Sequence, residues 1–171
     1  MISRPDKVER AIQLRLTELA RAWKETSRSY SVPYCTRQLK RAIGAQGRER
    51  GYAVHTAAPG FRQLGEWLFD ITWLAVAGQQ VLEIPLAAEI EWTPGNETLW
   101  DFQKLLVSRA RHRVLVMWTR TNQKAARIID GLIQQVSRFK QNRRGDRYLF
   151  ACYLMDSEKF IFRVHVVSRP A

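Results

Sequence analysis

The stretch WLFDITWLAVAGQQVLEIPLAAEIEW, residues 67–92, decides the fold. Its two halves, 67–76 and 81–92, are rich in β-branched, aromatic and aliphatic residues, and Gly78-Gln79-Gln80 between them is typical of a hairpin connection. The pattern therefore predicts two long antiparallel strands. If the chain turns about Gln79 or Gln80, Asp70 lies opposite residue 88, 89 or 90. The middle one of these three registers pairs Asp70 with Glu89.

Helices and further strands are expected on both sides of this hairpin. Upstream, apolar periodicity predicts a helix over 6–29, a turn over 30–33, a second helix over 36–51 with Thr36 as its N-cap, and a short strand over 52–56. Downstream, we expect a helix over 99–110, a strand over 113–119, a helix over 125–139 and a hairpin of strands 148–155 and 160–167. The unbroken VLVMW at 114–118 predicts a central strand covered on both faces.

This order of elements predicts an α/β fold with a mixed central sheet flanked by helices. We expect one domain, because 171 residues can bury one core. Its parts would be an N-terminal helix (1–32), a core (33–119) and a C-terminal helix with a hairpin (120–171).

The charge of the chain indicates the kind of partner. Lys and Arg number 28 and Asp and Glu 16, giving a net charge of +12. This excess favours nucleic acid as a partner, because cations placed near phosphates release condensed counterions; a charge that serves only solubility is the alternative. The basic side chains that we expect to contact nucleic acid are Arg48, Arg50, Arg143 and Arg144.

Other partners and locations follow from what the sequence lacks. No apolar run approaches the ~20 residues of a membrane span, and the basic residues are not gathered on one amphipathic helix, so no membrane partner is expected. The first residues, MISRPDKVERAIQ, contain no apolar signal core, which predicts a cytoplasmic protein. A homodimer is left open.

Three carboxylates stand inside the hairpin strands. Glu89 and Glu91 share one strand face because side chains alternate, and Asp70 is expected opposite Glu89. Opposed carboxylates repel one another, so a cation should compensate. Mg²⁺ or Mn²⁺ fits this role, since Mg²⁺ commonly takes one or two carboxylates together with water and phosphate. A solvated strand face is the alternative interpretation.

With these residues in place, the segment 51–118 resembles the restriction-endonuclease-like PD-(D/E)xK nuclease superfamily. The core of that superfamily is a helix, three strands, a helix and a strand, with Asp on the second strand and Glu-x-Lys on the third. The resemblance implies that Asp70 and Glu89 are metal ligands. Glu91 stands where the motif Lys is usual, a Glu-x-Glu variant that some restriction enzymes of the superfamily carry, and would either ligate the metal or accept a proton.

Two further residues are candidates for the same site. Lys104, in the segment LWDFQKLL, resembles a migrated motif lysine, although helical geometry turns it away from the apolar stripe of its helix. Glu66 is an accessory acidic candidate. A solvated position is the alternative for both.

The resemblance implies a metal-dependent DNA endonuclease that hydrolyses phosphodiester bonds. The alternatives are a catalytically inactive nucleic-acid-binding module of the same fold, and an interaction subunit of a defence or recombination system.

Overall fold

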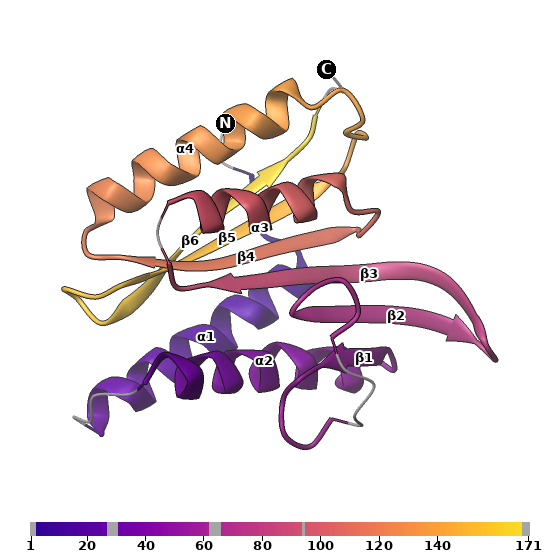
Figure 1. The fold of residues 1–171 in the computed structure, drawn as a ribbon, viewed down its shortest axis with the longest axis horizontal. Coiled ribbons are helices and arrows are strands. Elements are labelled where there is room, and N and C mark those ends of the chain that lie inside the picture. The colour runs from indigo at the N-terminus through magenta and orange to yellow at the C-terminus, as the bar shows by residue number, and fades with distance from the viewer. Residues whose placement is uncertain (1–2, 27–30, 62–65, 94, 169–171) are drawn as a thin grey trace.

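The structure, a computed structural model, describes residues 3–26, 31–61, 66–93 and 95–168. Within these residues the chain is an α/β protein with a six-stranded mixed sheet between two layers of helices (Figure 1). In chain order the elements are α1 (Lys7–Glu25), α2 (Val32–Glu49), β1 (Ala53–Thr56), β2 (Ile71–Ala77), β3 (Gln80–Glu91), α3 (Asn96–Val107), β4 (His112–Thr119), α4 (Asn122–Arg138), β5 (Arg147–Leu154) and β6 (Lys159–Val166).

The strands lie in the sheet in their sequence order, β1 to β6. β1, β2 and β3 are antiparallel, β3, β4 and β5 are parallel, and β5 and β6 form an antiparallel hairpin. The parallel pairs need crossover connections, which α3 and α4 provide. The predicted α/β class, the mixed sheet and both predicted hairpins are therefore confirmed.

The register of β2 and β3 is the one predicted from the sequence, with Asp70 opposite Glu89. Ile71 pairs with Ala88, which aligns the preceding Asp70 with Glu89. The turn consists of Gly78 and Gln79, and Gly78 has a φ of 59°, the positive value that the first residue of a type II′ turn requires. The expected start of the strand at 67 is wrong, because β2 begins at Ile71. Leu68 has a φ of 67°, which interrupts an extended conformation before the strand can form.

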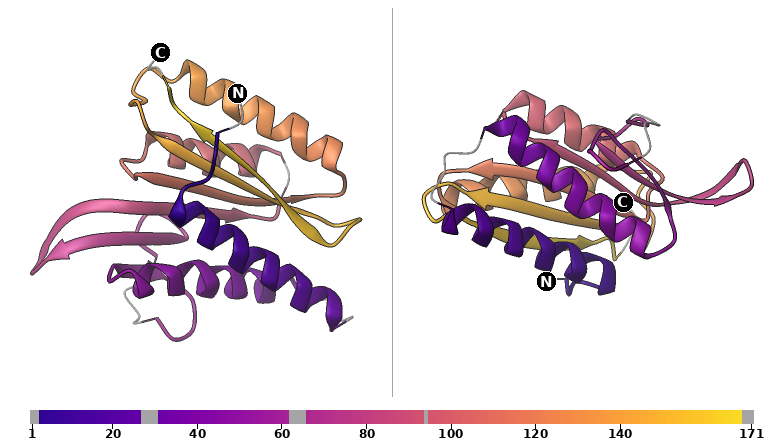
Figure 2. Two further views of the ribbon diagram at one scale, coloured as in Figure 1. Left: turned by 180° about the vertical axis from the view of Figure 1, so that it is seen from behind. Right: turned by 90° about the horizontal axis from the view of Figure 1, so that it is seen from below.

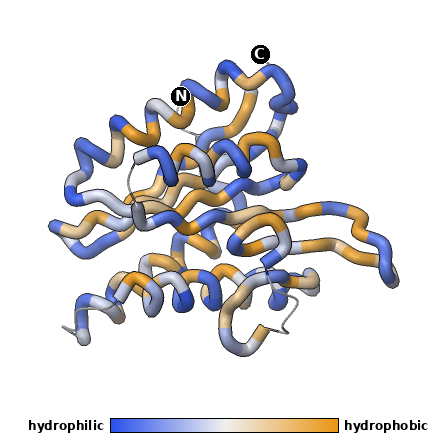
Figure 3. Tube along the Cα trace, viewed as in Figure 1, coloured by the Kyte–Doolittle hydropathy of each residue, from blue (hydrophilic) through white to orange (hydrophobic). Residues whose placement is uncertain are grey.

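Two hydrophobic cores cover the two faces of the sheet. α1 and α2 pack on one face around side chains such as Trp73, Ile90 and Val116, and α3 and α4 pack on the other around Phe102 and Phe150. Figure 3 shows hydrophobic residues concentrated along the central strands and alternating with hydrophilic ones along the helices. β4 is buried along nearly its whole length, as predicted from its unbroken apolar sequence.

Helix α2 begins earlier than predicted. Its N-cap is Ser31, so 31–33 do not form the expected turn, and residue 30 lies outside the described residues. Pro33 fits in the first helical turn, where a missing N–H costs no hydrogen bond. Further along, Gly47 packs so closely on β2 that a Cβ there would lie 2.7 Å from the Trp73 Nε1 atom. The absence of a side chain at Gly47 therefore lets the helix approach the sheet closely.

The segment ahead of α1 crosses the strands at the β6 side of the sheet (Figure 2). The Val166 backbone N–H in β6 donates to Ser3 Oγ at 3.2 Å, and the Arg147 guanidinium donates to the Arg4 carbonyl at 2.9 Å. Asp6 then caps α1 and accepts from the His112 ring at 2.8 Å. Within the described ranges, no helix has the length and apolar character needed to cross a membrane.

Candidate functional site

Asp70 lies at the point where the chain enters β2. Its Oδ2 atom accepts a hydrogen bond from the Ile90 backbone N–H at 2.8 Å, and its Oδ1 atom forms an ion pair with Lys40 Nζ at 2.8 Å. The Asp70 carboxylate therefore extends the hydrogen bonding between β2 and β3 by one residue, on the N-terminal side of β2. This contact fixes Asp70 beside the acidic end of β3.

Glu89 is the most buried of the predicted site residues, with 2% of its surface exposed. It lies on the face of β3 that α3 covers, next to Ala87 in the same alternation. Its Oε2 atom accepts from the Asp70 backbone N–H at 3.4 Å, and its Oε1 atom lies 2.5 Å from Lys104 Nζ. The structure thus brings Asp70, Glu89 and Lys104 together.

Lys104 reaches this position although its Cα lies away from the apolar stripe of α3. Phe102, Leu105 and Leu106 bury the stripe against the sheet, and the lysine side chain is 47% exposed. A lysine stem has four methylene groups and leans toward the helix N-terminus, so the ammonium can pass around the edge of the helix. The same ammonium forms an ion pair with Asp101 Oδ1 at 3.1 Å. Lys104 thus lies off the apolar stripe, as its helical position predicts, and still reaches Glu89.

Lys40, on α2, completes the arrangement from the other helical layer. It is buried, and its ammonium lies 2.5 Å from Glu66 Oε1 as well as 2.8 Å from Asp70. Sequence reasoning missed this lysine, because no local pattern links it to Asp70. Sequence reasoning did place Glu66 near the site, and among the described residues Lys40 is the side chain that contacts both Glu66 and Asp70.

Asp101 and Glu91 lie at the margin of the site. Sequence reasoning did not place Asp101 in the site, although its spacing of three from Lys104 is typical of a helical ion pair. Glu91, the last residue of β3, accepts a hydrogen bond from the Thr93 backbone N–H. The negative charge of Glu91 contributes to the raised pKa of Asp101. We call Glu66, Asp70, Glu89, Asp101, Lys40 and Lys104 together the carboxylate–lysine cluster.

Burial dominates the electrostatics of this cluster. It raises the pKa of Glu89 from 4.5 to about 7; Lys104 opposes the rise and the charge of Asp70 adds to it. Burial also raises the pKa of Asp101. Burial alone would lower the pKa of Lys40 and of Lys104, but the carboxylates that each contacts raise it overall. Both lysines are consequently cationic at neutral pH, while Glu89 can gain or lose a proton there.

The cluster suits a divalent cation only in part. Among the described residues, no three Asp, Glu, His or Cys side chains are placed to hold a metal ion together. Asp70 and Glu89 do approach one another and supply the hard oxygen donors that Mg²⁺ prefers. Counting Glu91, five carboxylates face two lysines here, so the site is negative within a chain of net charge +12.

The four arginines predicted to contact nucleic acid come from two segments. Arg48 and Arg50 lie at the C-terminal end of α2, where Arg48 donates to the Gly60 carbonyl at 2.7 Å and Arg50 donates to Gln46. Arg143 and Arg144 are exposed in the loop between α4 and β5. Arg48 and Arg50 thus already have partners within the chain.

Comparisons with protein-family profiles, with curated proteins and with solved structures found no match to this chain.

Proposed function

We propose that this protein is a metal-dependent nuclease of the restriction-endonuclease-like PD-(D/E)xK type, acting on DNA phosphodiester bonds. The observation that carries the proposal is the contact of Lys104 Nζ with the buried Glu89 carboxylate at 2.5 Å, beside Asp70. Two acids and a lysine from the expected strands and helix thus meet at one point. A nuclease site needs this combination of acidic metal ligands and a cation near the scissile phosphate.

The order of elements supports the same proposal. From α2 to β4 the chain forms a helix, three antiparallel strands, a helix and a strand parallel to the third, which resembles the core of that superfamily. Asp70 precedes the second strand of this set, and Glu89 and Glu91 end the third. Fold alone does not define a function, so the side chains carry the greater weight.

Asp70 and Glu89 are the residues that would hold Mg²⁺ or Mn²⁺. When bound, such a cation lowers the pKa of a coordinated water and stabilises negative charge on a phosphoryl oxygen. Glu91 would need to leave its hydrogen bond with the Thr93 N–H in order to join as a third oxygen donor. The fit therefore rests on two carboxylates, which is the number that Mg²⁺ commonly takes from protein.

The remaining roles belong to groups already in contact. Lys104 places its ammonium where negative charge would develop on a phosphate bound against Glu89. Burial raises the pKa of Glu89 to about 7, so this carboxyl would have to lose its proton before it could hold the cation, which favours metal binding above neutral pH. Lys40 positions Asp70 through the ion pair at 2.8 Å and does not itself need to touch substrate.

The test is cleavage of supercoiled plasmid, linear duplex and single-stranded DNA with Mg²⁺, Mn²⁺ or EDTA. The wild type should cleave at least one substrate with metal and none with EDTA. Asp70→Asn and Glu89→Gln should abolish cleavage, whereas Glu97→Gln, which removes an exposed acid from the start of α3, should keep it. Metal-independent cleavage, or full activity in both site variants, would refute the proposal.

A second candidate function is a nucleic-acid-binding module without catalysis. The observation that favours it is that Lys40 and Lys104 already neutralise Asp70 and Glu89, as expected of a structural ion-pair network. This candidate predicts salt-dependent DNA binding with no cleavage under any metal. It also predicts that Mg²⁺ raises the melting temperature of wild type and Asp70→Asn equally, whereas a metal site would make the rise depend on Asp70.

A further inference from the structure

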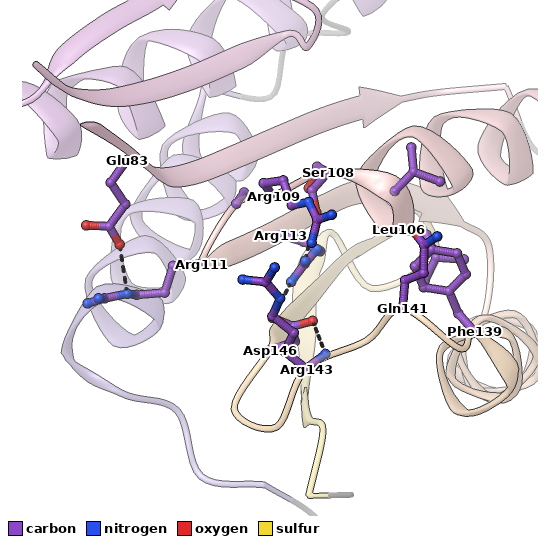
Figure 4. A pocket seen from close by; sticks show the side chains of 12 residues that line it. Glu83, Leu106, Ser108, Arg109, Arg111, Arg113, Phe139, Gln141, Arg143 and Asp146 are labelled. Carbon is purple, nitrogen blue, oxygen red and sulfur yellow. Dashed lines mark hydrogen bonds and ion pairs between the residues drawn. The ribbon is translucent and has the colours of Figure 1, made fainter. Parts of the chain in front are cut away.

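A small basic pocket lies at the C-terminal end of α3, outside the carboxylate–lysine cluster (Figure 4). The end of α3, the start of β4 and the loop between α4 and β5 form its walls, and its volume is about 100 Å³. The charged side chains that line it are Glu83, Arg109, Arg111, Arg113, Arg143 and Asp146. None of these belongs to the proposed nuclease site.

The charges in the pocket do not balance. Arg111 forms an ion pair with Glu83 at 3.1 Å, and Arg113 forms one with Asp146 at 3.4 Å. The side chains of Arg109 and Arg143 form no ion pair with any described residue, although the Arg143 backbone N–H donates to Asp146 at 2.8 Å. Four guanidinium groups against two carboxylates leave a net charge of +2 in the lining.

Arg113 gives the pocket a fixed cation. Its side chain is 5% exposed, and it donates to the carbonyls of Leu105 at 3.1 Å and Ser108 at 2.9 Å, with its guanidinium 4.9 Å from the ring centre of Tyr148. Its Nη1 atom is buried and lies 3.4 Å from the Asp146 carboxylate, its ion-pair partner, although it makes no hydrogen bond to the part of the chain that the structure describes. Arg113 is therefore held rigidly and contributes a fixed positive charge to the wall of the pocket.

We propose that this pocket binds a phosphoryl dianion. Guanidinium groups match phosphate oxygens in a two-pronged geometry, and the phosphate of a monoester carries about −1.5 to −2 charge at pH 7, which would balance the lining. A volume of about 100 Å³ holds one such group but no whole nucleotide, since pockets for larger ligands measure ~300 Å³ or more. The dianion can belong to free phosphate or to the 5′ end of a nucleic acid. The proposal does not depend on cleavage.

The first experiment measures binding of inorganic phosphate by ³¹P NMR titration at constant ionic strength in chloride. Wild type should show saturable binding, and Arg109→Ala/Arg143→Ala should weaken it at least tenfold. Both replaced side chains are exposed, so the variant should fold. Arg21→Ala/Arg41→Ala removes the same charge from exposed positions on α1 and α2 and should bind phosphate like wild type.

A second variant separates the effect of the guanidinium geometry from the effect of charge. Arg109→Lys/Arg143→Lys keeps both charges but not the two-pronged geometry, so its affinity should fall between those of wild type and the alanine variant. Absence of saturable phosphate binding in wild type, or equal affinity in wild type and the alanine variant, would overturn the proposal.

A third measurement identifies the source of the phosphate. It compares 5′-phosphorylated and 5′-hydroxyl single-stranded oligonucleotides for binding to wild type and to Arg109→Ala/Arg143→Ala. A preference for the phosphorylated strand that the variant loses supports the pocket as a site for nucleic-acid ends. Saturable binding of inorganic phosphate without that preference supports it as a site for free phosphate.

Discussion

Replacing Glu89 by Gln should stabilise the protein above neutral pH and have little effect in acid. Burial raises the pKa of this carboxyl from 4.5 to about 7, so the folded chain holds the proton more tightly than the unfolded chain does. The resulting stabilisation is fully present below pH 4.5 and is lost as the pH rises through 7. Gln resembles the protonated carboxyl in shape and cannot lose that proton.

The magnitude follows from the two pKa values. Their difference corresponds to ~3 kcal/mol of unfolding free energy, on an order-of-magnitude scale. For a chain of this size, that amounts to roughly 6–12 °C in melting temperature. Lys104 keeps its ion pair with Asp101 in the variant, which limits secondary losses.

The assay is urea unfolding of wild type and Glu89→Gln at several pH values between 4.5 and 9. The stability of the variant relative to wild type should increase across this interval by ~3 kcal/mol. Glu97→Gln, which removes one negative charge from an exposed position, separates the effect of overall charge. A stability difference between wild type and Glu89→Gln that stays constant with pH would refute the reasoning.

Three further predictions address catalysis, DNA binding and packing. Lys104→Ala should lower the cleavage rate at saturating enzyme by roughly 100-fold or more while DNA affinity barely changes, and a wild-type rate would exclude it from the chemistry. The logarithm of duplex affinity should fall linearly with the logarithm of salt concentration and survive Asp70→Asn; no binding at low salt would count against both candidate functions. Gly47→Ala should destabilise the fold by about 1–3 kcal/mol because its Cβ meets Trp73, whereas Gly131→Ala in α4, with nothing within 4 Å, should stabilise it by about 0.4–1 kcal/mol, both measured by urea unfolding.

The parts of the fold that could be predicted are those set by local pattern. The unbroken apolar run in β4 and the glycine turn at Gly78 depend only on neighbouring residues, and both lie where the sequence places them. The start of β2 could not be predicted, because the left-handed conformation of Leu68 leaves no mark in residue type. An exposed leucine adopts such a conformation only when the surrounding chain imposes it.

In the candidate site too, local pattern predicts some of the contacts, and tertiary packing determines the others. Strand alternation and register were enough to place Asp70 beside Glu89. The partnership of Lys40 with Asp70 joins α2 to the entry of β2, 30 residues further along the chain, and arises only when the helical layer packs on the sheet. The reach of Lys104 depended on the length of its side chain, which a projection of Cα positions around a helix does not include.

The segment ahead of α1 has a consequence for aggregation. β6 is an edge strand, and an edge strand offers unpaired N–H and C=O groups to the strands of other molecules. Ser3 accepts the Val166 N–H, so this segment occupies part of that edge, while the opposite edge is β1, only four residues long. Short edge strands and covered edge strands are two ways in which sheets avoid pairing edge to edge with other molecules. Deleting residues 3–5 would remove the acceptor of the Val166 N–H and expose the end of β6, so concentrated solutions of the deletion variant should self-associate before those of the wild type.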